Sequence, residues 1–538
     1  MQCRDSSYRR DDRKTSPDGA FRQYERVALS RYFLVLDAGT GSIRAIIFDT
    51  NGKQIAIAQY EWEHIAEAHV AGSMGFDFVR GWELAKRCIR ESIAASGVNP
   101  SEIAAVSASS MREGIVVYDG EKREIWGVAN VDGRSGEEVS YLKKTFPTLE
   151  AESYAISGQT FALSAAPRLL WLRNNRPSVY EKARYFTMIS DWILFKLSGE
   201  LASEPSNGGT AGAFSLQNRT WNKTEFERCG LKDLFVPIRE SGEVLGHINA
   251  ETSNETGLST ETLVVMGGGD VQIGTAGLGA SALGDAVVLG GSFWQQVVNI
   301  PSDAKLSNEM LLRVNPHVVR GMSQAEGITF FTGLVMRWFR NTLGCGKSYA
   351  ELEAMAKNVP LGSYGITPIF SDRMNYGEWI HASPSFIGLG LDESKYNVAS
   401  MFRALEENAA IVSAINLENI KAFSGVSPAS ITFASGASNG ALWSQILADV
   451  TGLAVNVPVV KEATALGVAM ACGIGTGVYK SFEEAGEEIV KIERTYEPNT
   501  VNHAQYGEIK EKWLKVYSKQ MELVREGTLE PMWKAPGA

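Results

Sequence analysis

From residue 32 onward the chain alternates short apolar runs with small-residue turns. The runs cover 32–38, 43–49 and 55–59, separated by a glycine turn and by Asn51-Gly52. Because Asn-Gly between apolar runs is a strong hairpin signal, they predict three antiparallel strands. A helix is predicted at 79–95, then strands at 103–107, 115–117 and 124–127. Hairpin strands followed by helix and strand alternation predict a mixed α/β sheet covered by helices.

A similar pattern starts again in the second half of the chain. Residues 262–266 predict a strand that closes on Gly267-Gly268-Gly269-Asp270, and 286–290 predict a strand ending in another small-residue turn. A further strand is predicted at 295–300. Repetition of one α/β unit indicates internal duplication, with a boundary near residue 280 and a ligand-binding cleft between the halves.

The remaining segments complete the predicted organisation. Helices are predicted at 399–420, 442–451, 463–472 and 506–526, and strands at 430–434 and 455–457. Residues 1–30 mix basic and acidic side chains with few apolar ones, which predicts a disordered extension, or alternatively a basic arm that binds a partner. We therefore expect an extension at 1–30, a first domain at 31–280 and a second domain at 281–538.

Composition restricts the function classes. The 538 residues carry a net charge of -10, which argues against nucleic acid as the main partner. The sequence shows no apolar run long enough to span a membrane and no apolar core of a signal peptide. Its five cysteines are scattered without a CxxC pair, which fits a reducing cytoplasm, and its six histidines lack metal-ligand spacing.

The first glycine turn is the strongest candidate for a nucleotide-phosphate site. It contains Gly39, Thr40, Gly41 and Ser42, preceded by Asp37 and followed by Arg44. Turn N–H groups can form a nest for phosphate oxygens, and arginine matches phosphate geometry. Asp37 could hold Mg²⁺. The glycines alone would equally fit an ordinary hairpin, but the acid, hydroxyls and arginine together favour phosphate binding.

Asp270 is the candidate general base. It follows a predicted strand and three glycines at the start of a predicted helix, where ligands of α/β sheets bind. A carboxylate there could accept the proton of a substrate hydroxyl during phosphoryl transfer, and could also contribute to a metal site. The alternative is a helix cap, although three glycines exceed what a cap needs.

Three charged residues are candidates for substrate binding. Arg112 and Glu113 follow a predicted strand and offer donors and acceptors side by side, while Asp132 lies in a nearby loop. Such groups suit a polyhydroxylated or carbonyl substrate, but an isolated Arg-Glu pair is more often a surface ion pair. The loop 435–440 follows a strand and precedes a helix, which allows backbone approach to a nucleotide.

Taken in order, these segments resemble the FGGY family of carbohydrate kinases. The resemblance covers about Tyr32 to Tyr479 and rests on the DxGTxSxR turn, the GGGD segment, Leu289–Ser292, 171–175, 435–452 and Glu462–Gly467. It implies two duplicated actin-like or RNase H-like ATPase domains with an interdomain cleft. It also implies ATP and Mg²⁺ as cofactors. The further nucleotide residues that it implies are Gly291, Ser292, Gly333, Gly436, Ala437 and Asn439, and the further substrate residues are Gln272 and Trp294.

Several segments, including 109–117, 293–299 and 368–374, are similar to one member of that family. This similarity implies phosphorylation of a linear dihydroxy-pentanedione, the opened form of a quorum-sensing signal. It leaves open a monomer or a homodimer, and control by the phosphocarrier protein HPr. The alternatives are a pentulose or polyol kinase, and a non-catalytic ATP-binding switch like actin or Hsp70. Ser435 and Ala437 replace family glycines, and Asn130 replaces a tryptophan, which suits a small linear substrate.

Overall fold

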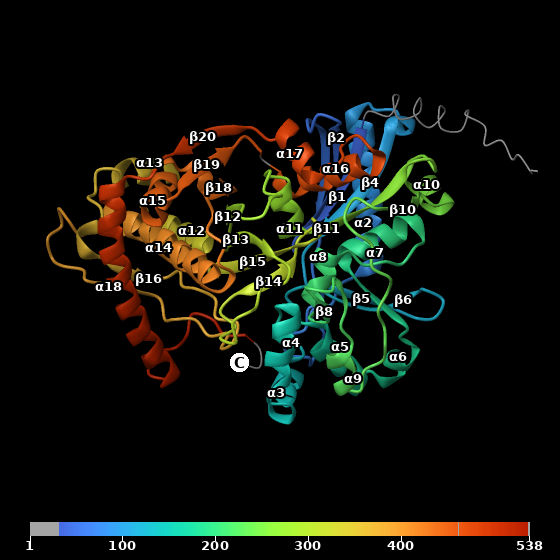
Figure 1. Ribbon diagram of the computed structural model, residues 1–538, viewed down its shortest axis with the longest axis horizontal. Coiled ribbons are helices and arrows are strands. Elements are labelled where there is room, and N and C mark those ends of the chain that lie inside the picture. The colour runs from blue at the N-terminus through green and yellow to red at the C-terminus, as the bar shows by residue number, and fades with distance from the viewer. Residues whose placement is uncertain (1–31, 461, 536–538) are drawn as a thin grey trace, which may run out of the picture.

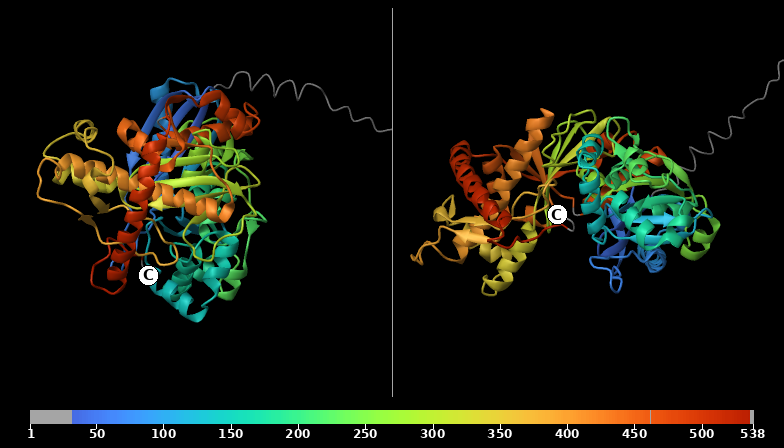
Figure 2. Two further views of the ribbon diagram at one scale, coloured as in Figure 1. Left: turned by 60° about the vertical axis from the view of Figure 1, so that its left-hand side comes forward. Right: turned by 90° about the horizontal axis from the view of Figure 1, so that it is seen from below.

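Two mixed sheets, each covered by helices, form the two bodies of the molecule (Figure 1). The computed structural model describes residues 32–460 and 462–535. The predicted disordered extension at 1–30 lies outside these residues. Figure 2 shows the same two bodies from two other directions, one carrying mainly the blue to green part of the chain and the other mainly the yellow to red part.

The strands form two large and three small sheets. The first sheet has the order β10 (Val244–His247), β11 (Leu263–Gly269), β4 (Ile103–Ser110), β1 (Tyr32–Ala38), β2 (Ser42–Asp49) and β3 (Gln54–Glu61). The second has the order β14 (Arg313–Pro316), β15 (Met322–Thr329), β13 (Trp294–Pro301), β12 (Ala286–Gly290), β18 (Ser430–Ala434), β19 (Ala454–Pro458) and β20 (Ile492–Tyr496). The small sheets are β6 (Glu124–Val128), β5 (Ile115–Tyr118) and β7 (Tyr185–Met188); β8 (Phe214–Ser215) and β9 (Thr220–Trp221); and β16 (Thr367–Ile369) and β17 (Ser385–Ile387).

The two large sheets share one topology. β1 pairs antiparallel with β2 and parallel with β4, β4 runs parallel to β11, and β11 pairs antiparallel with β10. β12 repeats these relations with β13, β18, β19 and β20. β3 and β15 each flank the second strand, and β14 is the additional strand of the second sheet. The repeated order confirms the predicted duplication.

Helices cover both sheets. Those before residue 280 are α2 (Phe78–Ser96), α3 (Gly136–Thr145), α4 (Leu149–Ser157), α5 (Ala165–Asn175), α6 (Pro177–Lys182), α7 (Ile189–Ser198), α8 (Pro205–Gly208), α9 (Thr224–Arg228), α10 (Ala250–Thr256) and α11 (Asp270–Ala276). Those after it are α12 (Thr332–Thr342), α13 (Tyr349–Ala356), α14 (Val398–Ser424), α15 (Ala441–Thr451), α16 (Ala463–Thr476), α17 (Phe482–Ile489) and α18 (Thr500–Arg525). The 3₁₀ turns are η1 (Pro100–Glu102), η2 (Gly209–Ala211), η3 (Ser363–Gly365) and η4 (Gly436–Asn439).

Helices α16 and α17 belong to the second half of the sequence but pack on the first sheet. Figure 1 shows them, coloured red, beside the blue strands β1, β2 and β4. Val468 and Cys472 of α16 share one buried cluster with Phe33 and Val35 of β1. A Cβ on Gly467 would lie 1.9 Å from the Ile273 carbonyl oxygen of α11, so only glycine allows these two helices to cross so closely. The two halves are therefore interlocked through α11 and α16.

Candidate functional site

The first hairpin carries a partly buried charge cluster beside its turn. Asp37 of β1 lies directly opposite Arg44 of β2, and the two side chains form an ion pair. Arg44 also donates a 2.6 Å hydrogen bond to Glu462, which stands at the start of α16. Burial raises the pKa of Asp37, while the opposing charge of Arg44 lowers it. The sequence identified Asp37 and Arg44, but gave no signal that Glu462 contacts them.

The glycine turn between β1 and β2 accepts hydrogen bonds from Trp62 and Asn130 and has free space beside Gly41. Trp62 Nε1 lies 3.1 Å from the carbonyl oxygen of Gly39 and 3.2 Å from that of Thr40. Asn130 Nδ2 donates a 3.0 Å hydrogen bond to Thr40 Oγ1. A Cβ on Gly41 would meet no atom within 4 Å, so space for a ligand remains beside this turn. Ser42 begins β2 next to it.

The second small-residue turn occupies the matching place in the second sheet. Gly290 lies opposite Trp294, and the turn between them contains Gly291 and Ser292. Gly333 packs on this turn, because its N–H donates a 3.0 Å hydrogen bond to the Ser292 carbonyl oxygen. A Cβ on Gly333 would lie 2.3 Å from the Gly291 oxygen, which explains the glycine. The structure thus brings Gly291, Ser292 and Gly333 together.

The loop that follows β18 lies next to this second turn. Leu289 of β12 pairs with Ala434 of β18, so the two strands end side by side. Asn439 Nδ2 donates a 3.1 Å hydrogen bond to the Gly436 carbonyl oxygen within η4. The Cβ of Ala437 lies close to Gly290, since a Cβ added at Gly290 would come within 2.7 Å of it. Gly436, Ala437 and Asn439 therefore border the second turn.

Asp270 is the first residue of α11, as predicted. The three glycines before it have a different structural role from the predicted one. The glycines belong to β11, whose end is Gly269, and are not a turn after the strand. A Cβ on Gly267 would lie 1.9 Å from the Ala108 carbonyl oxygen of β4, so the glycines allow close strand packing. Gly269 is the N-cap, and Asp270 is the first helical residue. Asp270 is therefore not the N-cap residue, although its Oδ1 accepts a 2.8 Å hydrogen bond from the Val271 N–H of the first turn.

The Asp270 carboxylate is accessible, and the cation beside it is not in close contact. Its side chain is 38% exposed, and Arg112 Nε lies 3.5 Å from Oδ1. Burial raises the pKa of Asp270 to about 6, against the charge of Arg112. The group is thus ionised at neutral pH and near the pKa that suits a general base. Its position behind β11 is fixed by Ser206 Oγ, which accepts a 2.9 Å hydrogen bond from the Gly269 N–H.

Two ion pairs cross between the halves beside Asp270. Arg112 donates to Glu326 at 2.6 and 3.0 Å, and Glu113 pairs with Arg313. Arg313 and Glu326 lie directly opposite each other on β14 and β15. Arg112 and Glu113 are thus buried interdomain residues and not a surface pair. Sequence reasoning missed Arg313 and Glu326, which carry no local motif.

Two other predicted substrate residues have structural partners. Asp132 is fully buried, and its carboxylate accepts hydrogen bonds from Arg134 Nε and from the Met74 N–H. Gln272 is also fully buried and donates a 3.2 Å hydrogen bond to Gln324 of β15. Gln272 thus joins the two halves, whereas the partners of Asp132 lie in the first domain. Contact of either side chain with the substrate stays a prediction.

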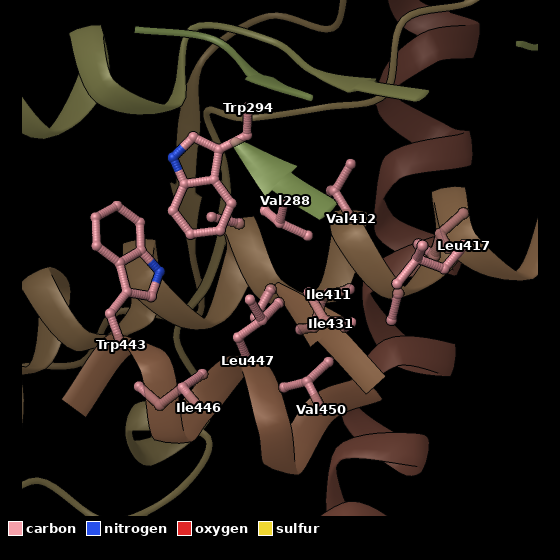
Figure 3. Close-up of a cluster of buried hydrophobic side chains, with 14 of the residues drawn as sticks. Val288, Trp294, Ile411, Val412, Leu417, Ile431, Trp443, Ile446, Leu447 and Val450 are labelled. Atoms are coloured by element: carbon pink, nitrogen blue, oxygen red, sulfur yellow. The ribbon is translucent and has the colours of Figure 1, made fainter. Parts of the chain in front are cut away.

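Trp294 lies in the core of the second domain, which corrects its predicted place at the substrate. Its ring is fully buried and lies 4.6 Å from Trp443 and 5.1 Å from Phe433, measured between ring centroids. Figure 3 shows Trp294 beside Trp443 and Val288, above the helices that cover this face of the sheet. Side chains alternate along a strand, so the next residue of β13, Gln295, points the other way.

Family models match both halves of this arrangement. Residues 32–277 match the N-terminal domain of the FGGY family of carbohydrate kinases, and 297–476 match its C-terminal domain. The chain belongs to the FGGY family of carbohydrate kinases. Membership implies an enzyme that uses ATP, so the alternative of a non-catalytic actin-like or Hsp70-like switch is not supported.

Relatives extend the FGGY assignment over nearly the whole chain. A protein named autoinducer-2 kinase from Salmonella typhimurium is 53% identical over 519 residues, 94% of this chain and 98% of that protein. The protein of that name from Yersinia enterocolitica is 52% identical over 528 residues, 96% of this chain and 99% of its own. The crystal structure of xylulose kinase from Rhodospirillum rubrum shares the FGGY fold, with a TM-score of 0.82 and 21% identity over 92% of this chain and 100% of that one.

Within 32–460 and 462–535, no helix has the length and apolarity needed to cross a bilayer. In the same part of this FGGY kinase, no group of three or more His, Cys, Asp or Glu side chains is arranged to hold a metal.

Proposed function

We propose that this FGGY kinase transfers the terminal phosphate of ATP to a hydroxyl of autoinducer-2, in the linear dihydroxy-pentanedione form. The observation that carries this proposal is the identity of 52–53% to proteins named autoinducer-2 kinase, over at least 94% of this chain. The accessible carboxylate of Asp270, beside the ion pairs that join the two halves, supports a transfer to a small hydroxyl acceptor.

Phosphoryl transfer depends mostly on positioning and on charge neutralisation. In this proposal Asp270 accepts the proton of the attacking hydroxyl, and Arg112 holds a second oxygen of the acceptor nearby. The backbone N–H groups of Gly39–Ser42 and of Gly291–Ser292 hold the transferring phosphate from the two domains. Gly436, Ala437 and Asn439 border the adenine. Closure of the interface excludes water, which otherwise competes with the acceptor.

The residues present fit a nucleotide-bound Mg²⁺. Mg²⁺ is usually held by one or two protein carboxylates together with waters and substrate phosphates. Asp37 is a carboxylate beside the first turn, and Asp270 is a second one at the interface, so a dedicated protein cage is not needed. We assign Asp37 and Asp270 as the carboxylates that would face the ion. When bound, Mg²⁺ would neutralise phosphate charge.

The test is a panel of acceptors in a coupled ADP-release assay with ATP and Mg²⁺. The linear dihydroxy-pentanedione, xylulose and glycerol are compared by kcat/KM, with Asp270→Asn as the control for contaminating kinases. We expect the pentanedione to exceed the others by at least tenfold. If xylulose or glycerol is better by orders of magnitude, the chain is a pentulose or polyol kinase and the proposal fails.

Two implications of the resemblance stay predictions. One is control by HPr, tested by adding HPr to the same assay and measuring turnover. The other is the choice between a monomer and a homodimer, tested by light scattering of the purified chain.

A further inference from the structure

The two duplicated hairpins place Gln295 at the position that Arg44 occupies in the first sheet. In the first hairpin the penultimate residue of β1, Asp37, pairs with Arg44. In the second hairpin the penultimate residue of β12, Leu289, pairs with Gln295. The pairs nearest the turns, Ala38 with Ile43 and Gly290 with Trp294, correspond in the same way. Ile43 and Trp294 are both fully buried, so the hairpins match in orientation as well as in register.

The strand register shows that Gln295 faces the first domain. Val297 lies opposite Glu326, whose carboxylate binds Arg112 of the first domain. Gln295 is two residues from Val297 and therefore points to the same face. The opposite face carries Trp294 and Gln296, and Gln296 binds Ser413 of α14.

The duplicated topology also relates the surroundings of Arg44 and Gln295. Arg44 binds Glu462 at the start of α16, and α16 packs on the first sheet. Helix α11 has the same place after β11 that α16 has after β19, and it packs on the second sheet. There Val271 of α11 shares a buried cluster with Val287 and Val297, with Leu289 packed against it. The residue at the start of α11 is Asp270. By this correspondence, Gln295 lies against the end of α11 that carries the candidate base.

The Gln295 side chain is available for a ligand. It is half-buried, and among the described residues its amide takes part in no hydrogen bond with another group. Phe293 lies in the turn just before β13, is 37% exposed and has its ring 5.0 Å from that of Phe330. The second phosphate turn immediately precedes Phe293, so this face connects the phosphate end of the site to Asp270.

We propose that Gln295 binds the acceptor substrate directly and that Phe293 covers its apolar side. The amide offers one acceptor and two donors, which match a hydroxyl and a neighbouring carbonyl of one small molecule. Nearby charges select a neutral molecule, because Asp270, Glu113 and Glu326 outnumber Arg112 and Arg313. The acceptor class is therefore a neutral hydroxy-carbonyl compound. This inference rests on the proposed kinase activity but not on which acceptor is physiological.

The experiment measures the KM of ATP and of the best acceptor of the panel for Gln295→Ala and Phe293→Leu. The matched control is Gln54→Ala, which removes an exposed glutamine from the edge strand β3. We expect Gln295→Ala to raise the acceptor KM about tenfold with kcat and the ATP KM within twofold, because a contact made before and during transfer affects binding uniformly. Phe293→Leu raises the acceptor KM by a smaller factor.

An acceptor KM within twofold of wild type in Gln295→Ala overturns the inference. So does an equal rise in both KM values, since that result places Gln295 at the nucleotide. Thermal melts of all variants exclude unfolding as the cause. Because the acceptor is whichever compound the wild-type enzyme prefers, a failure of the autoinducer-2 assignment shows in the wild-type panel and leaves this test intact.

Discussion

The N-termini of α11 and α16 correspond in the two halves, and each carries an acid: Glu462 is the N-cap of α16, and Asp270 is the first residue of α11. At α16, Glu462 is bound by Arg44, which also neutralises Asp37. At α11, the strand position that corresponds to Arg44 is occupied by the neutral residue Gln295. The nearest cation to Asp270 is Arg112, whose Nε lies 3.5 Å from the carboxylate. A bound guanidinium lowers the basicity of a carboxylate. Corresponding helix N-termini therefore hold an ion-paired acid in one half and the candidate base in the other.

Removing each acid in turn gives the largest expected contrast. Asp270→Asn keeps the shape but cannot accept a proton, so turnover should fall by about 10²–10⁴-fold. Glu462→Gln removes an acid that Arg44 already neutralises, so turnover should stay within about tenfold of wild type. Turnover comes from the coupled assay, and calorimetry checks that ATP still binds. Near-normal turnover of Asp270→Asn would remove Asp270 from the mechanism.

Glu326→Gln should give Asp270 a directly bound guanidinium, as Glu462 already has. Glu326 holds the guanidinium of Arg112 with two hydrogen bonds, which leaves only Nε directed toward Asp270. Without this carboxylate, Arg112 can form a direct ion pair with Asp270. A charged hydrogen bond of about 1–3 kcal/mol at the base would lower kcat roughly ten- to a hundredfold.

The conservative variant Glu326→Asp is the control for that result, because it keeps the charge and should restore part of kcat. If Glu326→Gln lowers thermal stability with unchanged kcat, the pair with Arg112 only joins the domains.

Arg44→Gln gives the first hairpin the glutamine that the second hairpin carries at the corresponding position, Gln295. Asp37 and Glu462 then lose their shared cation, and the phosphate loses a positive group beside the first turn. We expect the KM for ATP to rise about tenfold while the acceptor KM changes little. Steady-state kinetics with each substrate varied in turn separate the two effects. A rise confined to the acceptor KM would show that the first hairpin does not serve ATP while the second serves the acceptor.

Local patterns were sufficient to predict the scaffold of this comparison. The helix expected at 79–95 is α2, and the strand expected at 430–434 is β18 without a change of bounds. Both have strong periodicity and clear ends. The two phosphate turns also follow from short glycine-containing segments, because a tight turn is specified by its own residues.

The contacts between the halves could not be predicted in this way. Arg112 and Glu326 are 214 residues apart, and neither has a local signal for the other. The aromatic residue beside the second turn shows a second limit, because the sequence alone does not show which face of β13 its first residue, Trp294, occupies. A shift of one residue reverses the face, and the register is set by pairing with β12 and β15. The sequence therefore indicated the turn but not that Trp294 points into the core.

The smallest expected effect concerns the loop beside the second turn, where this chain departs from the glycines of its family. Ser435 has φ 75° and ψ -171°, a conformation that is essentially restricted to glycine. Ser435→Gly should relieve this strain, and after the entropy that glycine adds to the unfolded state we expect a gain of about 1 kcal/mol in unfolding free energy. Denaturant titration measures that gain.

Ala437→Gly is the matched control, because Ala437 lies in η4 and is not among the residues with positive φ. Glycine at such a position only adds unfolded-state entropy, so this variant should lose about 0.5–1 kcal/mol. Opposite signs for the two variants would mean that the structure of this loop needs a glycine at 435 alone. Equal losses would show that contacts of the Ser435 side chain outweigh its backbone strain.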